Sequence, residues 1–363
     1  MSHPVPRPGI MDIDPYVGGE SSVSGKDQVI KLSSNEGAFG PSPKAVAAYE
    51  EAASNLHRYP DGSSEALRDG IGSLHGLDPE RIVCGAGSDE LISLLCQAYA
   101  GPGDEVLYSE HGFLMYPIAA MAVGATPISA AEKDLTADVD ALLERASGKT
   151  RLLFLANPNN PTGTYISGDE LWRLRQGLNE GVILVIDAAY AEYVTKGDYS
   201  PGIDLVDGGG NVVMTRTFSK IYGLGGARLG WAYCPTDIAG VLNRLRGPFN
   251  VSSPAMAAGL AALGDGKFTD MSRKHNETWL AWTREKLIEL GLDVTPSAGN
   301  FVLVGFPQDP GRDATAADAF LKDRGIIVRR MEAYGLDNCL RITIGQEDEM
   351  RAAVGAIQEF LAP

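Results

Sequence analysis

One lysine of this chain lies among residues that could bind a phosphorylated aldehyde. Lys220 follows Thr217 and Ser219, and a glycine-rich loop then runs to Arg228. A lysine amine forms a Schiff base with an aldehyde, whereas hydroxyls, loop amides and a guanidinium bind phosphate. Pyridoxal 5′-phosphate (PLP) carries both groups. Because apolar, strand-like segments flank the loop, a cofactor-binding role explains Lys220 better than a solvated surface position.

A carboxylate at the end of an apolar run is the second informative feature. Residues 182–186 read Val-Ile-Leu-Val-Ile and lead directly into Asp187. A buried carboxylate is costly without a cationic partner, and the protonated nitrogen of a pyridine ring would be one. Tyr190 could donate a hydrogen bond to a hydroxyl of the same ring. Asp187 could otherwise cap the next turn, with Tyr190 filling the core, and it is Lys220 that favours the ring-binding interpretation.

Two loops after other predicted strands could also contact a ligand. Residues 85–87, Gly-Ala-Gly, precede a helix that begins near Ser88 and Asp89. Helix N-termini attract anions, although ordinary N-capping explains the same residues. The segment 157–163, Asn-Pro-Asn-Asn-Pro-Thr-Gly, offers the side-chain amide of Asn160, although such a sequence also simply ends a strand. Neither loop identifies a site by itself.

These residues need a scaffold that brings the ends of strands together. Between residues 81 and 234, short continuous apolar runs alternate with helix-like segments. This alternation indicates a mostly parallel sheet covered on both faces, with ligands at the carboxyl ends of its strands. We therefore expect an α/β fold with a three-layer large domain and a smaller α+β domain at the C-terminus. The expected division is an N-terminal arm over residues 1–40, a large PLP-binding domain over 41–248 and a small domain over 249–363.

The expected elements follow from the apolar runs and their period. The expected strands are residues 81–84, 105–108, 151–156, 182–186, 211–215, 229–234, 301–304, 326–329 and 340–344. The expected helices include residues 113–123, 138–146, 168–178, 254–290 with a break near 264–266, 314–324 and 347–361.

Composition and charge restrict the class of protein. The chain has 363 residues and a formal net charge of −16, which argues against nucleic acid or an anionic membrane surface as a partner. An anionic substrate would then need a local cluster of arginines. The four cysteines are widely separated and three lie in apolar runs, which indicates reduced thiols and a cytoplasmic location. The sequence shows no signal peptide, no apolar run of the roughly 20 residues that span a bilayer, and no metal-ligand spacing among its histidines.

Six segments taken together resemble the aspartate-aminotransferase-like superfamily of fold-type-I PLP enzymes. Within it, the closest resemblance is to the histidinol-phosphate aminotransferase family, and it extends from Asp14 to the C-terminal helix. The six segments are Arg58-Tyr59-Pro60-Asp61-Gly62, Gly87-Ser88-Asp89-Glu90, Asn159-Asn160-Pro161-Thr162-Gly163, Asp187-Ala188-Ala189-Tyr190, Thr217-Phe218-Ser219-Lys220 and Leu340-Arg341-Ile342-Thr343-Ile344-Gly345. The resemblance implies a PLP-dependent transaminase that works as a homodimer with shared active sites.

The resemblance implies a role for each residue that contacts the cofactor. Lys220 holds PLP through the Schiff base and later moves a proton between two carbon atoms. Asp187 pairs with the pyridinium nitrogen, which makes the ring an electron acceptor. The other implied contacts are Tyr190 and Asn160 on the ring hydroxyl and Phe113 stacked on the ring. The phosphate would be bound by the backbone amides of Ser88 and Asp89, the hydroxyls of Thr217 and Ser219, the guanidinium of Arg228, and Tyr59 of the partner subunit. The implied catalytic residues are Lys220, Asp187 and Tyr190.

The resemblance also implies residues that bind the substrate. Arg341 would bind the carboxylate of glutamate and, when L-histidinol phosphate is bound, its phosphate, because a planar guanidinium suits both anions. Arg329 would bind the substrate phosphate as well, although the sequence does not decide between it and the adjacent Arg330. Tyr16 of the partner subunit would reach the site on its N-terminal arm. Asn35 would line the pocket entrance.

The implied reaction is transamination of L-histidinol phosphate with 2-oxoglutarate to imidazole acetol phosphate and L-glutamate, a step of histidine biosynthesis. The alternative is an aromatic amino acid or prephenate aminotransferase of broad specificity, since residues 328–336 are similar to broad-specificity members. A PLP-dependent lyase acting on threonine phosphate, a PLP-binding regulator and a nucleotide-dependent dehydrogenase are less favoured. The chain shows no basic patch or DNA-binding helix pair, and its loop at 85–87 lacks the full dinucleotide-binding spacing. The sequence does not determine how strictly L-histidinol phosphate is preferred.

Overall fold

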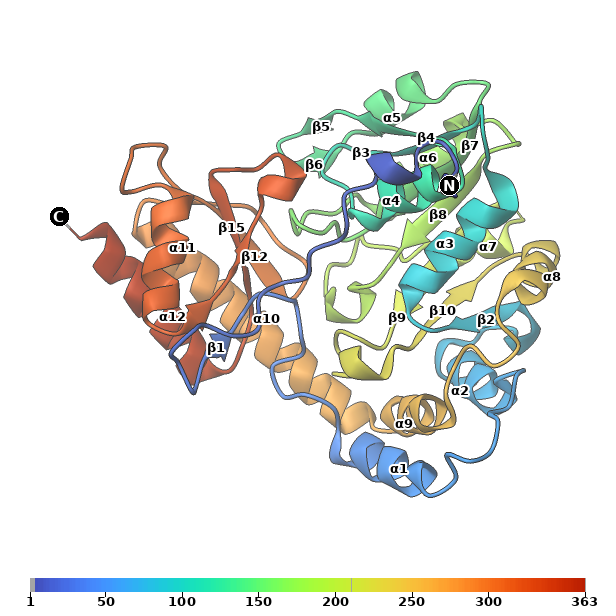
Figure 1. Cartoon of the computed structure of the whole chain (residues 1–363), viewed down its shortest axis with the longest axis horizontal. Coiled ribbons are helices and arrows are strands. Elements are labelled where there is room, and N and C mark those ends of the chain that lie inside the picture. Colours follow the sequence, from blue (N-terminus) through green and yellow to red (C-terminus); the bar gives the residue numbers. More distant parts are fainter. Residues whose placement is uncertain (1–3, 210, 363) are drawn as a thin grey trace.

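A seven-stranded sheet forms the centre of the larger part of the molecule (Figure 1). The structure, a computed structural model, describes residues 4–209 and 211–362, so residues 1–3 of the predicted arm and residue 363 of the predicted small domain lie outside the described residues. In spatial order the strands are β2 (Ile82–Gly85), β10 (Gly230–Tyr233), β9 (Val212–Thr217), β8 (Ile183–Asp187), β7 (Thr150–Ala156), β3 (Glu105–Ser109) and β4 (Thr126–Ala130).

Neighbouring strands of this sheet are parallel except at β10, which runs antiparallel to both β2 and β9. Strands β2, β3, β7, β8 and β9 therefore point the same way, and their carboxyl ends meet at one edge. The predicted mostly parallel sheet is confirmed. The sequence analysis missed β4, because this edge strand contains Pro127 and is only partly buried, so its apolar pattern is weak.

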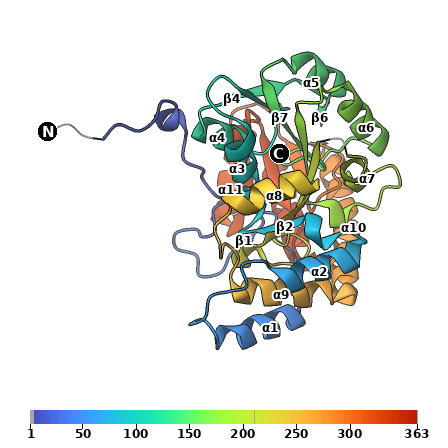
Figure 2. The ribbon, with the colours of Figure 1, turned by 90° about the vertical axis from the view of Figure 1, so that its right-hand side faces the viewer.

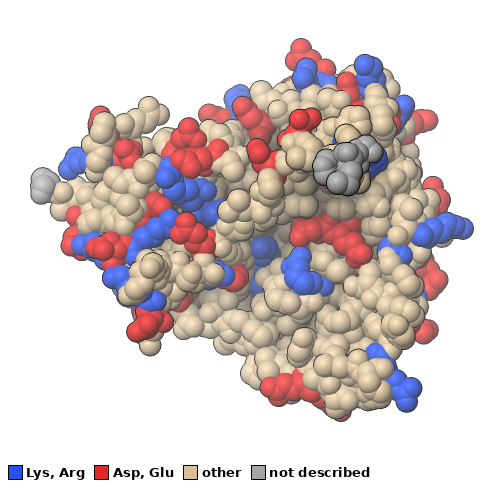
Figure 3. Space-filling model, in the orientation of Figure 1, with Lys and Arg blue, Asp and Glu red and all other residues tan. Residues whose placement is uncertain are grey.

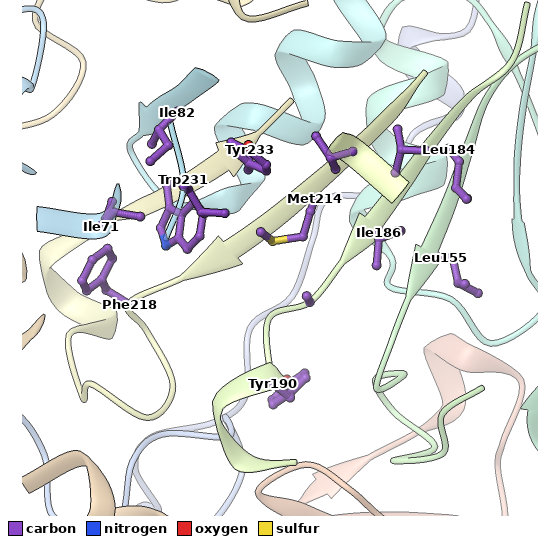
Figure 4. Close-up of a cluster of buried hydrophobic side chains, with 14 of the residues drawn as sticks. Ile71, Ile82, Leu155, Leu184, Ile186, Tyr190, Met214, Phe218, Trp231 and Tyr233 are labelled. Carbon is purple, nitrogen blue, oxygen red and sulfur yellow. The ribbon is translucent and has the colours of Figure 1, made fainter. Parts of the chain in front are cut away.

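Strand β8 shows why the parallel strands read as continuous apolar runs. All five of its residues are buried. Leu184 and Ile186 belong to a buried cluster on one face of the sheet, and Val185 belongs to a cluster on the other face. A strand covered on both faces has no polar face. Figure 4 shows part of the first cluster, with Leu184 and Ile186 along the strand and Tyr190 beyond its end.

Helices cover both faces of the large sheet, which confirms the predicted three layers (Figures 1 and 2). The helices over one face are α2 (Glu65–His75), α5 (Val139–Arg145), α6 (Gly168–Gly177), α7 (Ile203–Asp207) and α9 (Ser253–Leu263), and α1 (Pro43–Ala53) packs on α9. The helices over the other face are α3 (Ser88–Tyr99), α4 (Met115–Ala122) and α8 (Thr236–Leu245). Within the described residues, no helix has the length and apolar character needed to cross a membrane.

The smaller part of the molecule contains a four-stranded antiparallel sheet with three helices against it. Its strands, in spatial order, are β11 (Asp293–Val294), β12 (Phe301–Gly305), β15 (Cys339–Thr343) and β14 (Arg329–Arg330). Its helices are α10 (Gly266–Glu289), α11 (Ala314–Asp323) and α12 (Glu347–Leu361). The predicted α+β character is confirmed. The strand expected at 326–329 is instead divided into β13 (Ile326–Ile327) and β14.

The chain passes from the core of the larger part to the core of the smaller part between α9 and α10. Ala255 and Ala258 of α9 belong to the buried cluster of the large sheet, whereas Trp279 and Leu287 of α10 belong to that of the small sheet. The helix that follows the predicted boundary at 248 thus packs with the large domain, and the division at 248 stays a prediction. The predicted break near 264–266 is confirmed, because α9 ends and α10 begins there.

The N-terminal arm follows the small domain before the chain enters the large one. Strand β1 (Ile30–Lys31) pairs in parallel with β13. Figure 2 shows the first part of the arm extending away from the rest of the molecule. The remaining short elements are the hairpin of β5 (Glu132–Lys133) and β6 (Thr136–Ala137), and the 3₁₀ helices η1 (Ile10–Asp12), η2 (Pro79–Arg81), η3 (Ala191–Tyr193), η4 (Gly225–Ala227) and η5 (Glu332–Tyr334).

Candidate active site

A cavity of about 320 Å³ lies at the carboxyl edge of the large sheet, where the arm and the small domain also contribute to its wall. Every predicted site residue except Tyr59 lines it. Those residues are Tyr16, Asn35, Ser88, Asp89, Phe113, Asn160, Asp187, Tyr190, Thr217, Ser219, Lys220, Arg228, Arg329 and Arg341. The fold therefore brings together side chains that come from the arm, the large domain and the small domain.

The large sheet supplies its share of the site from the ends of parallel strands. Asp187 is the last residue of β8, and Lys220 follows the end of β9 by three residues. Ser88 begins α3 shortly after β2, and Asn160 lies four residues beyond β7. Because these strands are parallel, residues far apart in the sequence meet at one edge.

Asp187 is buried without a cationic partner. Its Oδ2 accepts a hydrogen bond from Tyr116 Oη at 2.8 Å, and its Oδ1 accepts one from Thr215 Oγ1 at 3.3 Å. It takes part in no ion pair within residues 4–209 and 211–362. Burial raises the pKa of Asp187 to about 6, although the hydrogen bond from Tyr116 acts in the opposite direction. This setting fits a ligand that brings a cationic N–H, as a protonated pyridine does.

The amine of Lys220 faces the same cavity in a setting that favours its neutral form. Its Nζ donates to the backbone oxygen of Ser34 at 3.4 Å and lies 5.7 Å from the centroid of the Tyr190 ring. Burial, followed by the charge of Arg341, lowers the pKa of Lys220 to about 8. An amine with this pKa is partly neutral near neutral pH, and the neutral amine is the form that attacks an aldehyde.

Two glycines allow the chain to approach the first amides of α3. Gly87 precedes α3 with φ of 91°, and a Cβ on it would lie 2.5 Å from Nη2 of Arg228. A Cβ on Gly230 would lie 2.5 Å from the backbone nitrogen of Ser88. Without side chains at these two positions, the guanidinium and strand β10 can lie beside the helix N-terminus. Together with the partial positive charge of the helix, this arrangement fits a bound phosphate.

Hydroxyls complete the same part of the cavity. Thr217 Oγ1 donates to Ser219 Oγ at 3.0 Å, and the backbone N–H of Ser219 donates to Thr217 Oγ1 at 3.1 Å. Arg228 pairs with Asp89 at 3.0 Å, with both side chains about half exposed. The donor set of hydroxyls, helix amides and a guanidinium therefore fits the phosphate of PLP, as the aldehyde fits the amine of Lys220.

Arg341 of β15 lies in the wall of the cavity with part of its hydrogen-bonding capacity unused. Its Nη1 donates to Asn160 Oδ1, and its Nη2 donates to the backbone oxygen of Ser33 at 2.9 Å. Its Nε is buried and has no partner within the described part of the chain. Burial lowers the pKa of Arg341. A buried guanidinium with a free N–H fits an incoming carboxylate or phosphate.

Arg329 faces the cavity, whereas its neighbour Arg330 faces away from it. Arg329 lines the cavity and its Nη2 donates to the backbone oxygen of Val17 at 2.7 Å. Arg330 donates to Thr315 Oγ1 at 2.8 Å and forms an ion pair with Glu332. Successive residues of a strand point to opposite faces, so only one of the two arginines can reach the site.

The arm brings this chain's own Tyr16 to the cavity. The ring of Tyr16 packs edge-on against Phe113 at 6.4 Å between centroids. The contact of Arg329 with Val17, and the pairing of β1 with β13, hold the arm against its own chain. The structure thus differs from the implied arrangement, in which Tyr16 of the partner subunit enters the site.

Two other predicted residues make contacts that the sequence analysis did not specify. Asn35 is 1% exposed, and its side-chain amide is directed at Tyr190 and Thr343 rather than at the pocket entrance. Tyr59 is 83% exposed and stacks on Phe249 with 4.7 Å between ring centroids, outside the cavity. This position outside the chain's own cavity agrees with the expectation that Tyr59 serves the site of a partner subunit, and that role stays a prediction.

The sequence analysis missed Tyr116, whose hydroxyl holds Asp187. Tyr116 lies on α4, three residues after Phe113, and its ring stacks on Phe154 with 4.8 Å between centroids. In the helix expected over residues 113–123, residues at this spacing share one face, although α4 itself begins at Met115. The pair of aromatic residues after a predicted strand was therefore a usable signal. The backbone oxygens of Ser33 and Ser34, which contact Arg341 and Lys220, had no signal because backbone groups occur at every position.

The charge around the cavity differs from that of the whole chain. Its charged lining residues are Lys220, Arg228, Arg329, Arg341, Glu36, Asp89 and Asp187. Four are cations and three are carboxylates, in a chain of net charge −16. Figure 3 shows Lys and Arg atoms within the hollow near the middle of this face and at its rim. The local cluster of arginines that an anionic substrate would need is present.

Comparisons with known proteins agree on one family. The chain matches the model of aminotransferase class I and II over residues 27–357. It is 62% identical to a histidinol-phosphate aminotransferase of Paramagnetospirillum magneticum, with 99% of each chain covered, and 60% identical to one of Rhodospirillum rubrum, with 99% of this chain and 97% of the relative covered. The crystal structure of histidinol-phosphate aminotransferase from Sinorhizobium meliloti in complex with PLP matches at a TM-score of 0.89 and 28% identity, covering 99% of this chain and 98% of the other.

Proposed function

The chain belongs to the class I and II aminotransferase family, and we propose that it catalyses the PLP-dependent transamination of L-histidinol phosphate with 2-oxoglutarate. The products are imidazole acetol phosphate and L-glutamate, in a step of histidine biosynthesis. Relatives that carry this activity in their names match the chain over almost its whole length. The alternative, an aromatic amino acid or prephenate aminotransferase, is not favoured for the same reason.

One observation carries the proposal: a buried amine and a buried, unpaired carboxylate face the same cavity. When bound, PLP supplies an aldehyde that joins an amine and a protonated ring that withdraws electrons from the carbon beside that amine. Asp187 would keep the proton on the ring nitrogen, because its buried carboxylate forms no ion pair within the described residues. Lys220 would hold the cofactor and move the substrate's proton, and a pKa of about 8 lets its amine accept and release a proton near neutral pH.

The other residues of the large-domain side would orient the ring and hold its phosphate. Tyr190 and Asn160 would bind the ring hydroxyl, and Phe113 would stack on the ring. The residues proposed for the phosphate are Ser88, Asp89, Thr217, Ser219 and Arg228. This proposal is supported by the position of these residues around the backbone amides at the start of α3.

The arm and the small domain would bind the substrate. Arg341 would bind the carboxylate of glutamate or the phosphate of L-histidinol phosphate, and its free Nε supports this role. Arg329 would bind the substrate phosphate, since it faces the cavity and Arg330 does not. Tyr16 would add a hydroxyl at the same end, and Asn35 would line this side of the cavity.

We also propose that the enzyme is a homodimer in which Tyr59 of the partner subunit reaches the phosphate. Two aromatic rings, Tyr59 and Phe249, stack on each other at the surface while 83% and 46% exposed. Such an exposed apolar pair is typical of an interface. The four buried, free cysteines support the proposed cytoplasmic location.

The covalent role of Lys220 is tested by chemical trapping. Borohydride treatment of the purified protein should leave the cofactor attached to the peptide that contains Lys220, as measured by mass spectrometry. Lys220→Ala should lose both this label and the activity, whereas Lys196→Ala, which changes an exposed lysine, should keep both. A Lys220→Ala protein that still carries trapped cofactor would contradict the assignment.

The substrate is tested by comparing amino donors in the steady state. We expect kcat/KM for L-histidinol phosphate to exceed that for phenylalanine and tyrosine by at least about tenfold, because only the former presents a phosphate to the arginines. Equal values would favour the broad-specificity alternative.

The shared site is tested by mixing two inactive homodimers, Tyr59→Ala and Lys220→Ala. Exchange of subunits should restore part of the activity, because one site of each mixed dimer is then intact. An absence of activity after exchange has been verified by mass would indicate self-contained subunits.

A further inference from the structure

Asn35 makes hydrogen bonds through every polar group it has, and none of them reaches the entrance of the cavity. Its Nδ2 donates to Tyr190 Oη at 2.9 Å. Its Oδ1 accepts from Thr343 Oγ1 at 3.1 Å, and its backbone N–H donates to the same hydroxyl oxygen at 2.9 Å. Its backbone oxygen accepts from Asn300 Nδ2 at 3.1 Å. With 1% of its surface exposed, Asn35 is a connection between the two domains.

The direction of these hydrogen bonds is fixed by the donors and acceptors available. An amide NH₂ can only donate, so the oxygen of Tyr190 accepts from Asn35. Thr343 Oγ1 accepts a hydrogen bond from the backbone N–H of Asn35 and donates its only hydroxyl proton to Asn35 Oδ1. If the amide were reversed, the Thr343 proton would lose this acceptor and the Tyr190 proton would point at Asn35 Oδ1.

Tyr190 is therefore left with its proton unused by the protein. Its hydroxyl makes no further hydrogen bond with residues 4–209 or 211–362. The charged groups around it are Arg341 on β15, Lys220 after β9 and Asp187 at the end of β8. Its ring is fixed edge-on against Phe301 at 5.2 Å between centroids. The free proton thus belongs to a hydroxyl that lines the cavity.

The backbone of Asn35 is fixed in a left-handed conformation by contacts from the small domain. Asn35 has φ of 54°, in the left-handed region that side-chain-bearing residues rarely adopt. Asparagine adopts this region more readily than most residues, and the conformation persists where surrounding contacts fix it. Here Asn300 holds the carbonyls of both Asn35 and Glu36, and Thr343 holds the amide.

We propose that Asn35, oriented by Thr343, is a positioning residue that makes Tyr190 a hydrogen-bond donor toward the ring oxygen of the bound cofactor. The inference rests on the proposed function, in which Tyr190 contacts that oxygen. Arg341 and Thr343 lie two residues apart on β15 and so share one face of the strand. Strand β15 thereby carries both the proposed substrate-binding Arg341 and Thr343, which through Asn35 makes Tyr190 of the other domain a hydrogen-bond donor to the cofactor.

The test uses the visible absorption of the bound cofactor as a function of pH. A donor to the ring oxygen stabilises that oxygen as an anion, so the chromophore loses its proton at lower pH. Thr343→Val removes the hydroxyl that orients Asn35, and we expect the spectroscopic pKa to rise by about one unit. Thr343→Ser keeps the hydroxyl and should titrate like the wild type. Asn35→Asp, which replaces the donor by an acceptor, should raise the value at least as far as Thr343→Val.

A second background shows whether the effect passes through Tyr190. In Tyr190→Phe protein, Thr343→Val should no longer shift the titration, because the hydroxyl it acts on is missing. Circular dichroism checks that each variant is folded, and the Thr343 pair suffices if Asn35→Asp does not fold. Equal titrations of Thr343→Val and Thr343→Ser, or a shift of the same size in the Tyr190→Phe background, would overturn the inference. A wild-type protein without trapped cofactor would instead refute the proposed function.

Discussion

The two sides of the active site are built in different ways. On the large-domain side, Asp187 ends β8 and Lys220 follows β9 within one loop, so each side chain is placed by the strand that precedes it. On the other side, Arg341 of β15 donates to the backbone oxygen of Ser33, 308 residues earlier in the chain. The first side depends on local sequence and, in the proposed function, carries the chemistry. The second depends on contacts between the arm and the small domain, and we propose that it recognises the substrate.

The largest effect should come from the carboxylate of the large-domain side. Asp187→Asn keeps the shape of the side chain but removes the charge that would hold the ring nitrogen protonated. Loss of one partner of a buried charged pair costs about 4 kcal/mol, which corresponds to about a thousandfold in kcat. Steady-state kinetics with saturating PLP measure this, and KM for either substrate should change far less than kcat.

Asp198→Asn is the matched control for this change. Asp198 also accepts a hydrogen bond from a tyrosine, Tyr165 Oη at 2.7 Å, but it does not line the cavity. Its replacement should leave kcat unchanged. If Asp187→Asn kept kcat within about threefold of the wild type, the charge of Asp187 would have no part in the chemistry.

Asp187→Asn should also stabilise the cofactor-free protein. Burial raises the pKa of Asp187 from 3.8 to about 6, so the folded state binds its proton more tightly than the unfolded state. The contribution of the Asp187 proton to the free energy of unfolding of the wild type is therefore lost as pH rises between these two values, and this loss is complete above about pH 6. A difference of about two pH units corresponds to about 3 kcal/mol. Urea unfolding of the two apo proteins should show Asp187→Asn gaining this amount relative to the wild type between about pH 4 and pH 7, and a constant difference would contradict it.

The contrast between the two sides also explains what the sequence could predict. Lys220 and Asp187 follow continuous apolar runs, and a strand buried on both faces has no other sequence pattern, so the sheet and its strand-end residues were predictable. Strand β4 was missed because it is a half-exposed edge strand with Pro127. The choice between Arg329 and Arg330 depended on strand orientation, and the buried position of Asn35 depended on Thr343 across a domain boundary. Such contacts leave no local signal.

On the small-domain side, Arg341→Ala should weaken both substrates together. The substitution removes a guanidinium whose Nε–H is free to bind an anion. A hydrogen bond to a charged group contributes about 2 kcal/mol, which corresponds to about 30-fold in binding. KM for glutamate and for L-histidinol phosphate should both rise by about this factor. Arg324→Ala, which removes an arginine paired with Glu359 away from the cavity, should change neither. Unchanged KM values for both substrates in Arg341→Ala would assign the anion contact to another residue.

Arg329 and Arg330 provide the finest comparison, because they are adjacent and differ only in the face they occupy. Arg329→Ala should raise KM for L-histidinol phosphate about tenfold, a smaller effect than at Arg341 because Arg329 is partly exposed to solvent and its charge is screened. Glutamate and the aromatic amino acids carry no phosphate, so their KM values should stay within about twofold. Arg330→Ala should have no effect on any substrate, because its guanidinium is paired with Glu332 outside the cavity. If Arg330→Ala raised KM for L-histidinol phosphate and Arg329→Ala did not, β14 would present its other face to the substrate, and the small-domain side would have to rearrange when the substrate binds.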